Sequence, residues 1–399
     1  MSWAPARERR PVSGVLGQPA AAGLVHGMGK ELVEPDWDPL TSAEVHQVLA
    51  GYWPSGPGGD VITWRSPRPM SAAALVDWAG GTVFVKRHDV RVRTPGQLAA
   101  EHAFIEHLRA HGIPAPAVLR TREGGTAARR GDWVYEVHAA APGVDVYRDA
   151  LSWTPFASLG HARAAGAMLA RLHLAAASCP QPARPPAVLA SGCGIISAAD
   201  PLAAAGRLLA QRPGLAGYLA GRDWRRDLSR DVLPAIQRAA HRLAALDRQW
   251  AHGDWHPSNL TWTSAAADAA VAGVFDFGLA NRGYAVHDLA NALERSTVSW
   301  LDLTESGRAT ADLAAIDALL DGYQQIRPLS PAEAAALPVV FPVVHVEYAL
   351  SEVEYFADVV HDPANADLAY DGYLIDHARW FAGPDGSRVL EHLRRRAWT

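Results

Sequence analysis

The chain contains almost no lysine. Of its 37 basic residues only Lys30 and Lys86 are lysine, so arginine is used wherever a positive charge merely has to be present. Cysteine is equally rare, because Cys179 and Cys193 are the only two and they form no Cys-x-x-Cys pair. This argues against a disulfide scaffold and against a zinc site built from thiolates. We expect both thiols to be reduced and buried.

The balanced charge and the lack of long apolar runs limit the possible binding partners and the cellular location. The 37 basic and 42 acidic residues give a net charge of −5, which argues against a basic surface for nucleic acid or for an anionic membrane. No apolar run approaches the roughly 20 residues of a membrane span. Arginines near the N-terminus precede an apolar run, but Ser13, Gly17 and Pro19 break it, unlike an export signal. These patterns predict a cytoplasmic protein.

The organisation along the chain changes once. Hydrophobic residues make up 49% of the 399 positions, enough for a sizeable core and more than one folding unit. Residues 1–37 are rich in Gly, Pro and Ala without periodicity and predict a flexible extension that carries no chemistry. Short β-like segments and two helices, over 41–51 and 94–110, follow in residues 38–138. Beyond them, residues 139–399 are mostly helical. We therefore predict an α+β fold with a small antiparallel-sheet N-lobe (38–138) and a larger, mostly helical C-lobe (139–399).

Lys86 is notable because the chain has only two lysines. It lies on a predicted strand, and a compact ammonium can reach between two phosphate oxygens in a way that a guanidinium cannot. In the next helix, Glu101 shares an apolar stripe with Leu98 and Ile105. A carboxylate directed into a core needs a partner, so we predict that Glu101 pairs with Lys86. The alternative is that each side chain reaches water.

Oxygen-bearing side chains follow in a polar loop between β-like segments. The loop reads His252-Gly-Asp254-Trp-His-Pro-Ser-Asn259, and the next β-like segment ends in Phe-Asp276-Phe-Gly. Phosphoryl transfer needs one carboxylate for the proton of the attacking hydroxyl and oxygen ligands for magnesium. Asp254, Asn259 and Asp276 supply that set.

A zinc hydrolase is the competing interpretation of the loop, because His252, Asp254 and His256 alternate. A proline follows His256 directly, and no further cluster of zinc ligands stands nearby. We therefore interpret the histidines as groups that brace the loop. Asp288, which begins the next helical pattern, is predicted to accept hydrogen bonds from it.

Four motifs together resemble the aminoglycoside phosphotransferase and choline kinase superfamily. They are the loop HGDWHPSN, the segment FDFG, the later Asp288-Leu-Ala and the helical GAMLARLH that ends at His173. The resemblance covers about residues 40–300. It implies a protein-kinase-like fold and an enzyme that transfers phosphate to a hydroxyl, with Mg²⁺ and with ATP or GTP as the donor.

The resemblance also implies roles for the marked residues. Asp254 would be the catalytic base, and Asn259 and Asp276 would hold the magnesium ions. Lys86, paired with Glu101, would lie over the α- and β-phosphates.

The same resemblance implies a hinge at Val137, His138 and Ala139 that faces the nucleotide base. One departure from the pattern concerns the glycine-rich loop over the phosphates. The corresponding stretch reads Ser66-Pro-Arg-Pro-Met-Ser71-Ala, so we expect the lid to use backbone and serine contacts, Ser71 among them.

Two alternatives to a small-molecule kinase follow from the same residues. The motif Phe-Asp-Phe-Gly-Leu-Ala is close to that of protein kinases. However, residues 277–287 contain no Ser or Thr, and no Ala-Pro-Glu follows. A protein substrate is therefore disfavoured. A pseudokinase that only binds nucleotide would be expected to lack at least one key polar group. This chain has all five of them, namely Lys86, Glu101, Asp254, Asn259 and Asp276.

The region 345–378 suggests the kind of acceptor, because it contains acidic and aromatic residues and neither Lys nor Arg. The acids are Glu347, Glu352, Glu354, Asp358, Asp362, Asp367, Asp371 and Asp376, and the aromatics are Tyr348, Tyr355, Phe356, Tyr370 and Tyr373. Acids and aromatics together suit an ammonium ligand, which favours a small cationic acceptor such as an amino sugar or amino alcohol. An ordinary solvated helical face explains the pattern equally well.

Overall fold

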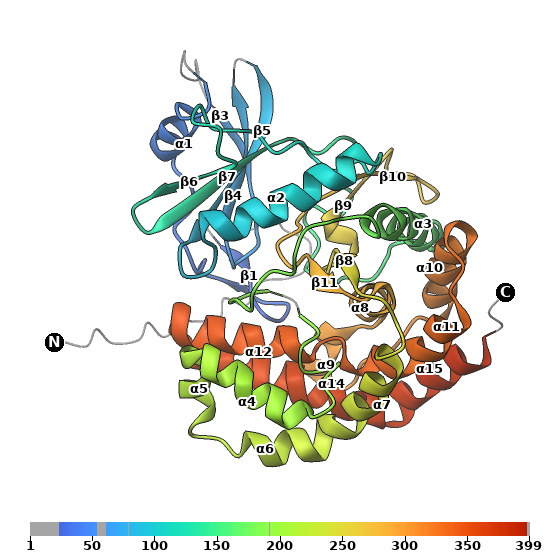
Figure 1. The fold of residues 1–399 in the computed structure, drawn as a ribbon. Helices are drawn as coiled ribbons and strands as arrows, with labels where there is room; N and C mark the ends of the chain where they lie inside the picture. The colour runs from blue at the N-terminus through green and yellow to red at the C-terminus, as the bar shows by residue number, and fades with distance from the viewer. Residues whose placement is uncertain (1–23, 54–60, 79, 191, 397–399) are drawn as a thin grey trace.

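The computed structural model describes residues 24–53, 61–78, 80–190 and 192–396. A small lobe built on a sheet sits above a larger helical lobe, and the segment after β7 (Trp133–Ala139) connects them (Figure 1). The predicted α+β, two-lobed fold is confirmed.

The N-lobe is built on one antiparallel sheet with the strand order β3-β4-β5-β7-β6. Its other strands are β3 (Val61–Arg65), β4 (Ala72–Trp78), β5 (Gly81–Asp89) and β6 (Ala127–Arg130). β5 pairs with both β4 and β7, and its register sets Lys86 directly opposite Glu136. Successive side chains of a strand point to opposite faces, so the neighbouring Val85 and Val137 face the lobe's apolar core.

Two helices flank this sheet. α1 (Ser42–Leu49) covers it with Val45 and Leu49, and α2 (Pro95–Ala110) lies between the sheet and the C-lobe (Figure 1). α2 begins with a capping box, since the Thr94 hydroxyl accepts the Gln97 N–H and the Gln97 side chain accepts the Thr94 N–H. Phe104 of α2 packs on Trp250 of the C-lobe with ring centroids 4.8 Å apart.

Residues 24–37 correct the predicted flexible extension. They form a short hairpin of β1 (Val25–His26) and β2 (Leu32–Val33), and the following stretch, with Trp37, packs against the cores of both lobes. The composition of this segment hid its contacts, because its apolar residues are too widely spaced to show a period. The part of the prediction that concerns residues 1–23 lies outside the described residues.

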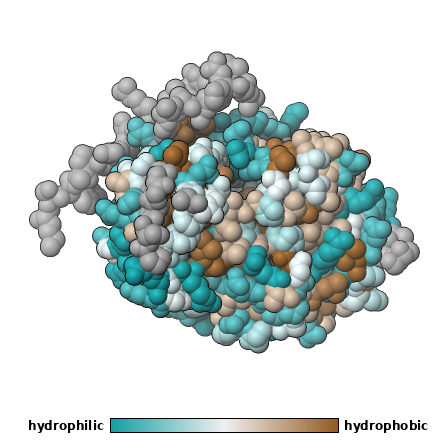
Figure 2. Space-filling model, turned by 90° about the horizontal axis from the view of Figure 1, so that it is seen from above, coloured by the Kyte–Doolittle hydropathy of each residue, from teal (hydrophilic) through white to brown (hydrophobic). Residues whose placement is uncertain are grey.

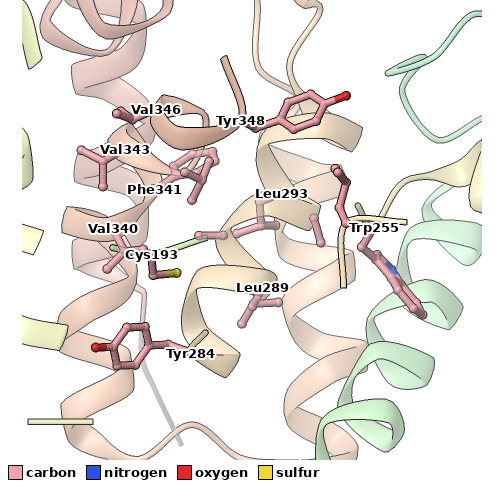
Figure 3. Packing of buried hydrophobic residues seen from close by; sticks show 14 of the residues in the cluster. Cys193, Trp255, Tyr284, Leu289, Leu293, Val340, Phe341, Val343, Val346 and Tyr348 are labelled. Carbon is pink, nitrogen blue, oxygen red and sulfur yellow. The ribbon is translucent and has the colours of Figure 1, made fainter. Parts of the chain in front are cut away.

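The C-lobe is a stack of helices around a large apolar core (Figure 1). Its α-helices are α3 (Leu159–Ala176), α4 (Pro201–Gln211), α5 (Pro213–Leu219), α6 (Trp224–Asp227), α7 (Leu233–Leu243), α8 (Ala285–Thr297), α9 (Trp300–Ser306), α10 (Leu313–Ile326), α11 (Pro331–Val340), α12 (Val346–Glu354), α13 (Pro363–Asp367), α14 (His377–Ala382) and α15 (Pro384–Arg395). α3 and α10 cross closely, because a Cβ at Gly166 or Gly322 would collide with the backbone of the partner helix. Leu289 and Leu293 of the buried α8 belong to the same apolar core as Phe341 (Figure 3).

Some helical stretches depart from the α pattern. η1 (Leu228–Val232), η4 (Tyr355–Val359) and η5 (Leu368–Asp376) are π-helical, and η2 (Pro257–Asn259) and η3 (Phe341–Val343) are 3₁₀ turns. Residues 228–243 thus form η1 followed directly by α7. Proline at 234 has no N–H to donate to an i−4 carbonyl, which accounts for a break in the α-helical hydrogen bonding here.

Two small antiparallel pairs support the polar loop at the interface of the lobes. β8 (Gln249–Ala251) pairs with β11 (Asn281–Gly283), and β9 (Leu260–Trp262) pairs with β10 (Val271–Val274). The pairing brings the residues before β9 next to those after β10, because the Phe275 N–H donates to the Asn259 carbonyl at 3.1 Å.

One helical stretch, Pro331–Val359, is long and apolar enough to cross a membrane by length and composition, although no such run was expected from the sequence. Of its most apolar window, 78% is buried inside the protein, as in a core helix. On the face seen in Figure 2, hydrophobic residues form separate patches among hydrophilic ones.

Candidate active site

Two cavities meet between the lobes. The first, here called the sheet cavity, measures about 200 Å³ and is lined from the N-lobe by residues such as Ala73, Phe84, Glu136, His138 and Ala139. The second, the helix cavity, measures about 180 Å³ and is lined by residues such as Met28, Asp254, Arg295, Tyr348 and Glu352. Six residues line both: Arg68, Ser71, Lys86, Glu101, Asn259 and Asp276. A molecule in one cavity would therefore meet a molecule in the other at these side chains.

The polar loop 252–259 is held from below by α8. Both carboxylate oxygens of Asp288 accept loop hydrogen bonds at 2.8 Å, one from the His252 N–H and one from the Gly253 N–H. His173 of α3 lies 3.0 Å from the same carboxylate. Gly253 has a φ of 79°, and a Cβ there would come within 2.6 Å of the Leu279 carbonyl oxygen, so the turn requires glycine. The predicted bracing by Asp288 is thus present.

Asn259 and Asp254 face each other across the loop. The Asn259 Nδ2 group donates to the Asp254 carbonyl oxygen at 2.8 Å and to its Oδ2 at 3.2 Å. Both partners are acceptors, which fixes the orientation of the amide and turns its oxygen away from Asp254. The other carboxylate oxygen of Asp254 accepts a hydrogen bond from Arg295 of α8.

The two loop histidines do not form a zinc site with Asp254. His252 Nε2 donates to the Phe275 carbonyl at 3.1 Å, and its Nδ1 accepts the Asp254 N–H at 3.2 Å, so both ring nitrogens are used within the site. Burial lowers the pKa of His252 to about 4 and that of His256 to about 3, and both rings are neutral at pH 7. The hydrogen bonds of His252 agree with the predicted bracing role, whereas His256 Nδ1 has no hydrogen-bond partner among the described residues and its Nε2 lies 3.5 Å from Asp254 Oδ1.

Lys86 and Asp276 form an ion pair at the junction of the cavities. Their Nζ and Oδ1 atoms are 3.1 Å apart. Burial alone would raise the pKa of Asp276, but the charge and hydrogen bond of Lys86 lower it to about 2. Asp276 has a φ of 56°, a conformation that a non-glycine residue adopts rarely and that sets its side chain at the end of β10. The lysine and the aspartate singled out from the sequence are thus brought together.

The predicted Lys86–Glu101 pair is wrong. Glu101 is buried, as its place on the apolar stripe indicated, but its Oε2 lies 3.5 Å from Arg184 Nη1. Arg184 also donates to the carbonyls of Gly278 and Ala280, at 3.0 and 2.9 Å. Helical spacing showed that Glu101 needs a partner but could not identify it, since Arg184 lies in a loop far along the chain.

Arg93 is a second buried arginine that the sequence analysis missed. It donates to the Gly278 carbonyl at 3.0 Å and to the Val188 carbonyl at 2.7 Å. Burial and the nearby Arg184 lower its pKa to about 10, so it stays charged. Together the two arginines hold the backbone directly after Asp276 and thereby fix that carboxylate.

Glu136 is the most prominent group that the sequence analysis overlooked. It lies on β7, 3% exposed, and its carboxylate is within 2.9 Å of His88 and His138 and within 2.7 Å of His102. Burial would raise its pKa, but the three histidines hold that pKa well below the usual value. A carboxylate within the apolar strand pattern WVYEV was the available signal.

The expected nucleotide-contacting residues lie as follows. His138 and Ala139 line the sheet cavity, and Ser71 lines both cavities. Val137 does not line either one, because the strand pleat directs its side chain into the N-lobe core, where it is fully buried. Arg68, in the stretch that replaces a glycine-rich loop, lines both cavities and was not predicted.

Comparison with known proteins agrees with this geometry. Residues 71–329 match the phosphotransferase enzyme family, which is well over half of the chain. The chain belongs to this family. It is a small-molecule kinase that transfers phosphate to a hydroxyl, so the predicted superfamily and enzyme class are confirmed.

Three relatives show how far the similarity in sequence extends. A homoserine kinase of Acidiphilium cryptum is 29% identical over 265 residues, 65% of this chain and 68% of that enzyme. An uncharacterized protein of Deinococcus radiodurans is 30% identical over 263 residues, 62% of this chain and 64% of that protein. A homoserine kinase of Xanthobacter autotrophicus is 27% identical over 313 residues, 75% of this chain and 81% of that enzyme.

Solved structures show the same fold at low sequence identity. A microcompartment-associated aminopropanol kinase superposes with a TM-score of 0.56 at 15% identity, covering 88% of this chain and all of that one. The amicoumacin kinase hAmiN, solved with AMP-PNP, Ca²⁺ and Ami, gives a TM-score of 0.53 at 14% identity, covering 89% and 93%.

Proposed function

We propose that this kinase transfers the γ-phosphate of ATP or GTP to a hydroxyl of a small cationic acceptor. The observation that carries the proposal is the junction of the two cavities. Asp254 lines only the helix cavity, Glu136 and His138 line only the sheet cavity, and Lys86, Asn259 and Asp276 line both. The nucleotide occupies the sheet cavity and the acceptor occupies the helix cavity, so the γ-phosphate lies where they meet.

Asp254 acts as the catalytic base. Its carboxylate accepts the proton of the acceptor hydroxyl, whose oxygen forms a bond to the γ-phosphorus while the bond to the leaving nucleoside diphosphate breaks. Arg295 and Asn259 hold the carboxylate in place through their hydrogen bonds to its two oxygens. Lys86 contributes a compact positive charge beside the phosphates.

The donor set fits a divalent cation of the magnesium type. Asp276 offers a carboxylate with a pKa of about 2, and the Asn259 amide oxygen is turned away from Asp254. Carboxylate and amide oxygens are hard ligands of the kind that Mg²⁺ prefers. Asn259 and Asp276 would hold the ion, which when bound neutralises charge on the phosphates. The solved hAmiN complex contains AMP-PNP and Ca²⁺ in the same fold, which supports a nucleotide and a divalent ion here.

Glu352 supports the choice of a cationic acceptor. It lines the helix cavity, is 2% exposed, and its Oε2 has no hydrogen-bond partner within the part of the chain that the structure describes. Burial raises the pKa of Glu352 to about 8 despite the nearby charge of Arg295 and a hydrogen bond with Tyr348. An ammonium group in the cavity would satisfy this carboxylate, and beside it lies Tyr348, whose ring already has the Arg295 guanidinium 4.7 Å from its centroid. Of the region 345–378, Glu352 and Tyr348 are the residues that line the helix cavity.

The relatives with printed activities support the same class of acceptor. Homoserine kinases act on an amino acid with a hydroxyl group, and aminopropanol kinase is named for an amino alcohol. We therefore propose hydroxylated amines as the first acceptors to test.

The test is nucleotide turnover with and without a panel of hydroxylated amines and matched neutral alcohols and sugars, in Mg²⁺ and after chelation. We expect acceptor-dependent release of nucleoside diphosphate that needs the divalent ion and favours the amines. If only neutral acceptors react, the cationic part of the proposal is wrong. If no acceptor stimulates turnover, the assignment of the two cavities is wrong.

A further inference from the structure

We propose that residues 24–37, here called the N-terminal strap, form the wall of the helix cavity that determines which acceptors fit. The inference rests on the proposed function, in which the acceptor occupies that cavity. The family match begins at residue 71, so the strap lies outside the part of the chain that follows the family pattern. The wall is therefore built from a segment that the family match does not include.

The tip of the strap forms part of the cavity surface. His26, Gly27, Met28 and Gly29 line the helix cavity together with Asp254. Met28 is partly buried and packs against the C-lobe core, so its side chain occupies a fixed place. Hydrogen bonds close the tip, because the Gly27 N–H donates to the Glu31 carbonyl at 2.9 Å and the Gly29 N–H donates to the Glu31 carboxylate at 3.1 Å. Acceptor size is therefore limited by a side chain, Met28, on a hydrogen-bonded turn.

The strap is hydrogen-bonded to Pro67 and Arg68, in the stretch that is expected to cover the nucleotide. The His26 N–H donates to the Pro67 carbonyl at 2.8 Å, and Arg68 donates to His26 Nδ1 at 3.0 Å. Burial and the adjacent Arg68 lower the pKa of His26 to about 4, so its ring is neutral and can accept that bond. Arg68 lines both cavities, so the strap orients a side chain at the junction.

The strap is also attached to the C-lobe. Lys30, one of the chain's two lysines, lies 2.6 Å from Asp302 and 2.9 Å from Glu305 of α9. The indole N–H of Trp37 donates to the Tyr355 hydroxyl at 3.0 Å. The Trp37 ring lies edge-on to Trp133 of the N-lobe, with centroids 5.4 Å apart, as well as to Tyr355 of the C-lobe at 6.5 Å. The strap therefore spans both lobes beside the cavity.

Two variants test the cavity wall and the ion pairs of Lys30 with α9 separately. Met28→Ala removes the side chain that limits the cavity, and Lys30→Glu reverses the charge at position 30 without touching the cavity lining. Pairing Lys30→Glu with Asp302→Lys and Glu305→Lys restores attraction across the same contact. Arg388→Ala breaks an exposed ion pair with Asp385 on α15 and is the matched control.

The measurements are kcat and KM for acceptors of graded size, the nucleotide Kd, and hydrogen exchange of the strap peptides. We expect Met28→Ala to shift kcat/KM at least about fivefold toward bulkier acceptors. We expect Lys30→Glu to raise the acceptor KM about three- to tenfold, the range available from two partly exposed ion pairs, and to speed exchange in residues 24–37. The charge-reversed triple variant should recover both values, and Arg388→Ala should change neither.

The outcomes separate this inference from the proposed function. If the parent enzyme phosphorylates acceptors but Met28→Ala leaves their ranking unchanged and Lys30→Glu leaves the acceptor KM within twofold, the strap is not the specificity wall. The proposed function then stands. If the parent enzyme phosphorylates no acceptor, the proposed function fails, and the inference fails with it.

Discussion

Two buried glutamates, one on each side of the junction, differ in how their charge is balanced. Glu136 in the sheet cavity receives three histidine side chains within 2.9 Å, and its pKa lies well below the usual value. Glu352 in the helix cavity has an oxygen that finds no hydrogen-bond partner in the described ranges, and its pKa is raised to about 8. An ionised group away from water requires compensation. The protein supplies three histidine partners to Glu136, whereas the charge of Arg295 and a hydrogen bond with Tyr348 do not offset the burial of Glu352.

This difference indicates that the two cavities have different tasks. In the sheet cavity, the buried Glu136 carboxylate has its partners within the fold. In the helix cavity, one oxygen of Glu352 has no hydrogen-bond partner among the described residues, and a cationic ligand would offset its charge. The following variants test the comparison in order of expected effect.

Glu136→Gln should destabilise the fold. Removing one partner of a buried ionic cluster leaves the remaining charges unbalanced and costs about 3 kcal/mol. The free energy of unfolding in urea measures the effect, and Glu123→Gln on an exposed turn is the matched control. An unchanged free energy of unfolding would show that the histidines do not depend on this carboxylate.

Lys86→Met should reduce kcat/KM for the nucleotide by about 100-fold, because a positive charge beside the phosphates is lost. Lys86→Arg should recover little of this, since the planar guanidinium cannot replace the compact ammonium against Asp276. Steady-state kinetics with the nucleotide varied provide the measurement. Full activity of the arginine variant would show that a compact ammonium group is not required at position 86.

Glu352→Gln should raise the KM of a cationic acceptor by about tenfold, equivalent to about 1.4 kcal/mol, and leave a neutral acceptor unaffected. The carboxyl group of the parent ionises with a pKa of about 8, so kcat/KM for a permanently cationic acceptor should rise as the pH increases toward 8. The Gln variant should lack this rise. Equal effects on cationic and neutral acceptors would indicate a steric role instead.

The pH dependence of stability tests the ionisation of the same carboxyl group in the folded protein. The folded-state pKa of Glu352 is raised, so its contribution to stability is fully present below the unfolded pKa of 4.5 and is lost as the pH rises through about 8. Glu294 has a pKa raised in the same way to about 8, chiefly by burial, so Glu352→Gln should remove about half of the combined slope. Unfolding free energies between pH 5 and pH 8.5 measure it. An unaltered slope would show that Glu352 ionises freely in the folded protein.

The sequence predicted the loop of the site better than its surroundings. Asp254, Asn259 and Asp276 lie on short segments joined by β9 and β10, so local pattern was enough to bring them together. The burial of Glu101 was also readable from helical spacing. Its partner Arg184 was not, because a stripe records which face is buried and contains no information about the loop that covers it.

Other errors have equally physical causes. Val137 was expected at the nucleotide because the hinge was treated as a run of residues, although the pleat alternates their directions and brings Glu136 and His138 to the cavity instead. Residues 24–37 were expected to be flexible because their composition shows no period. Their order comes from contacts with both lobes, such as those of Lys30 and Trp37, which only the folded chain supplies.

The most direct test of the two-cavity account is Asp254→Ala, with rate and nucleotide binding measured on the same preparation. Asp254 lines the helix cavity and not the sheet cavity, so kcat should fall about 1,000-fold while the nucleotide Kd stays within twofold. Asp268→Ala, on the exposed turn between β9 and β10, should change neither. Transfer at the parental rate, or a loss of nucleotide binding as large as the loss of rate, would contradict the account.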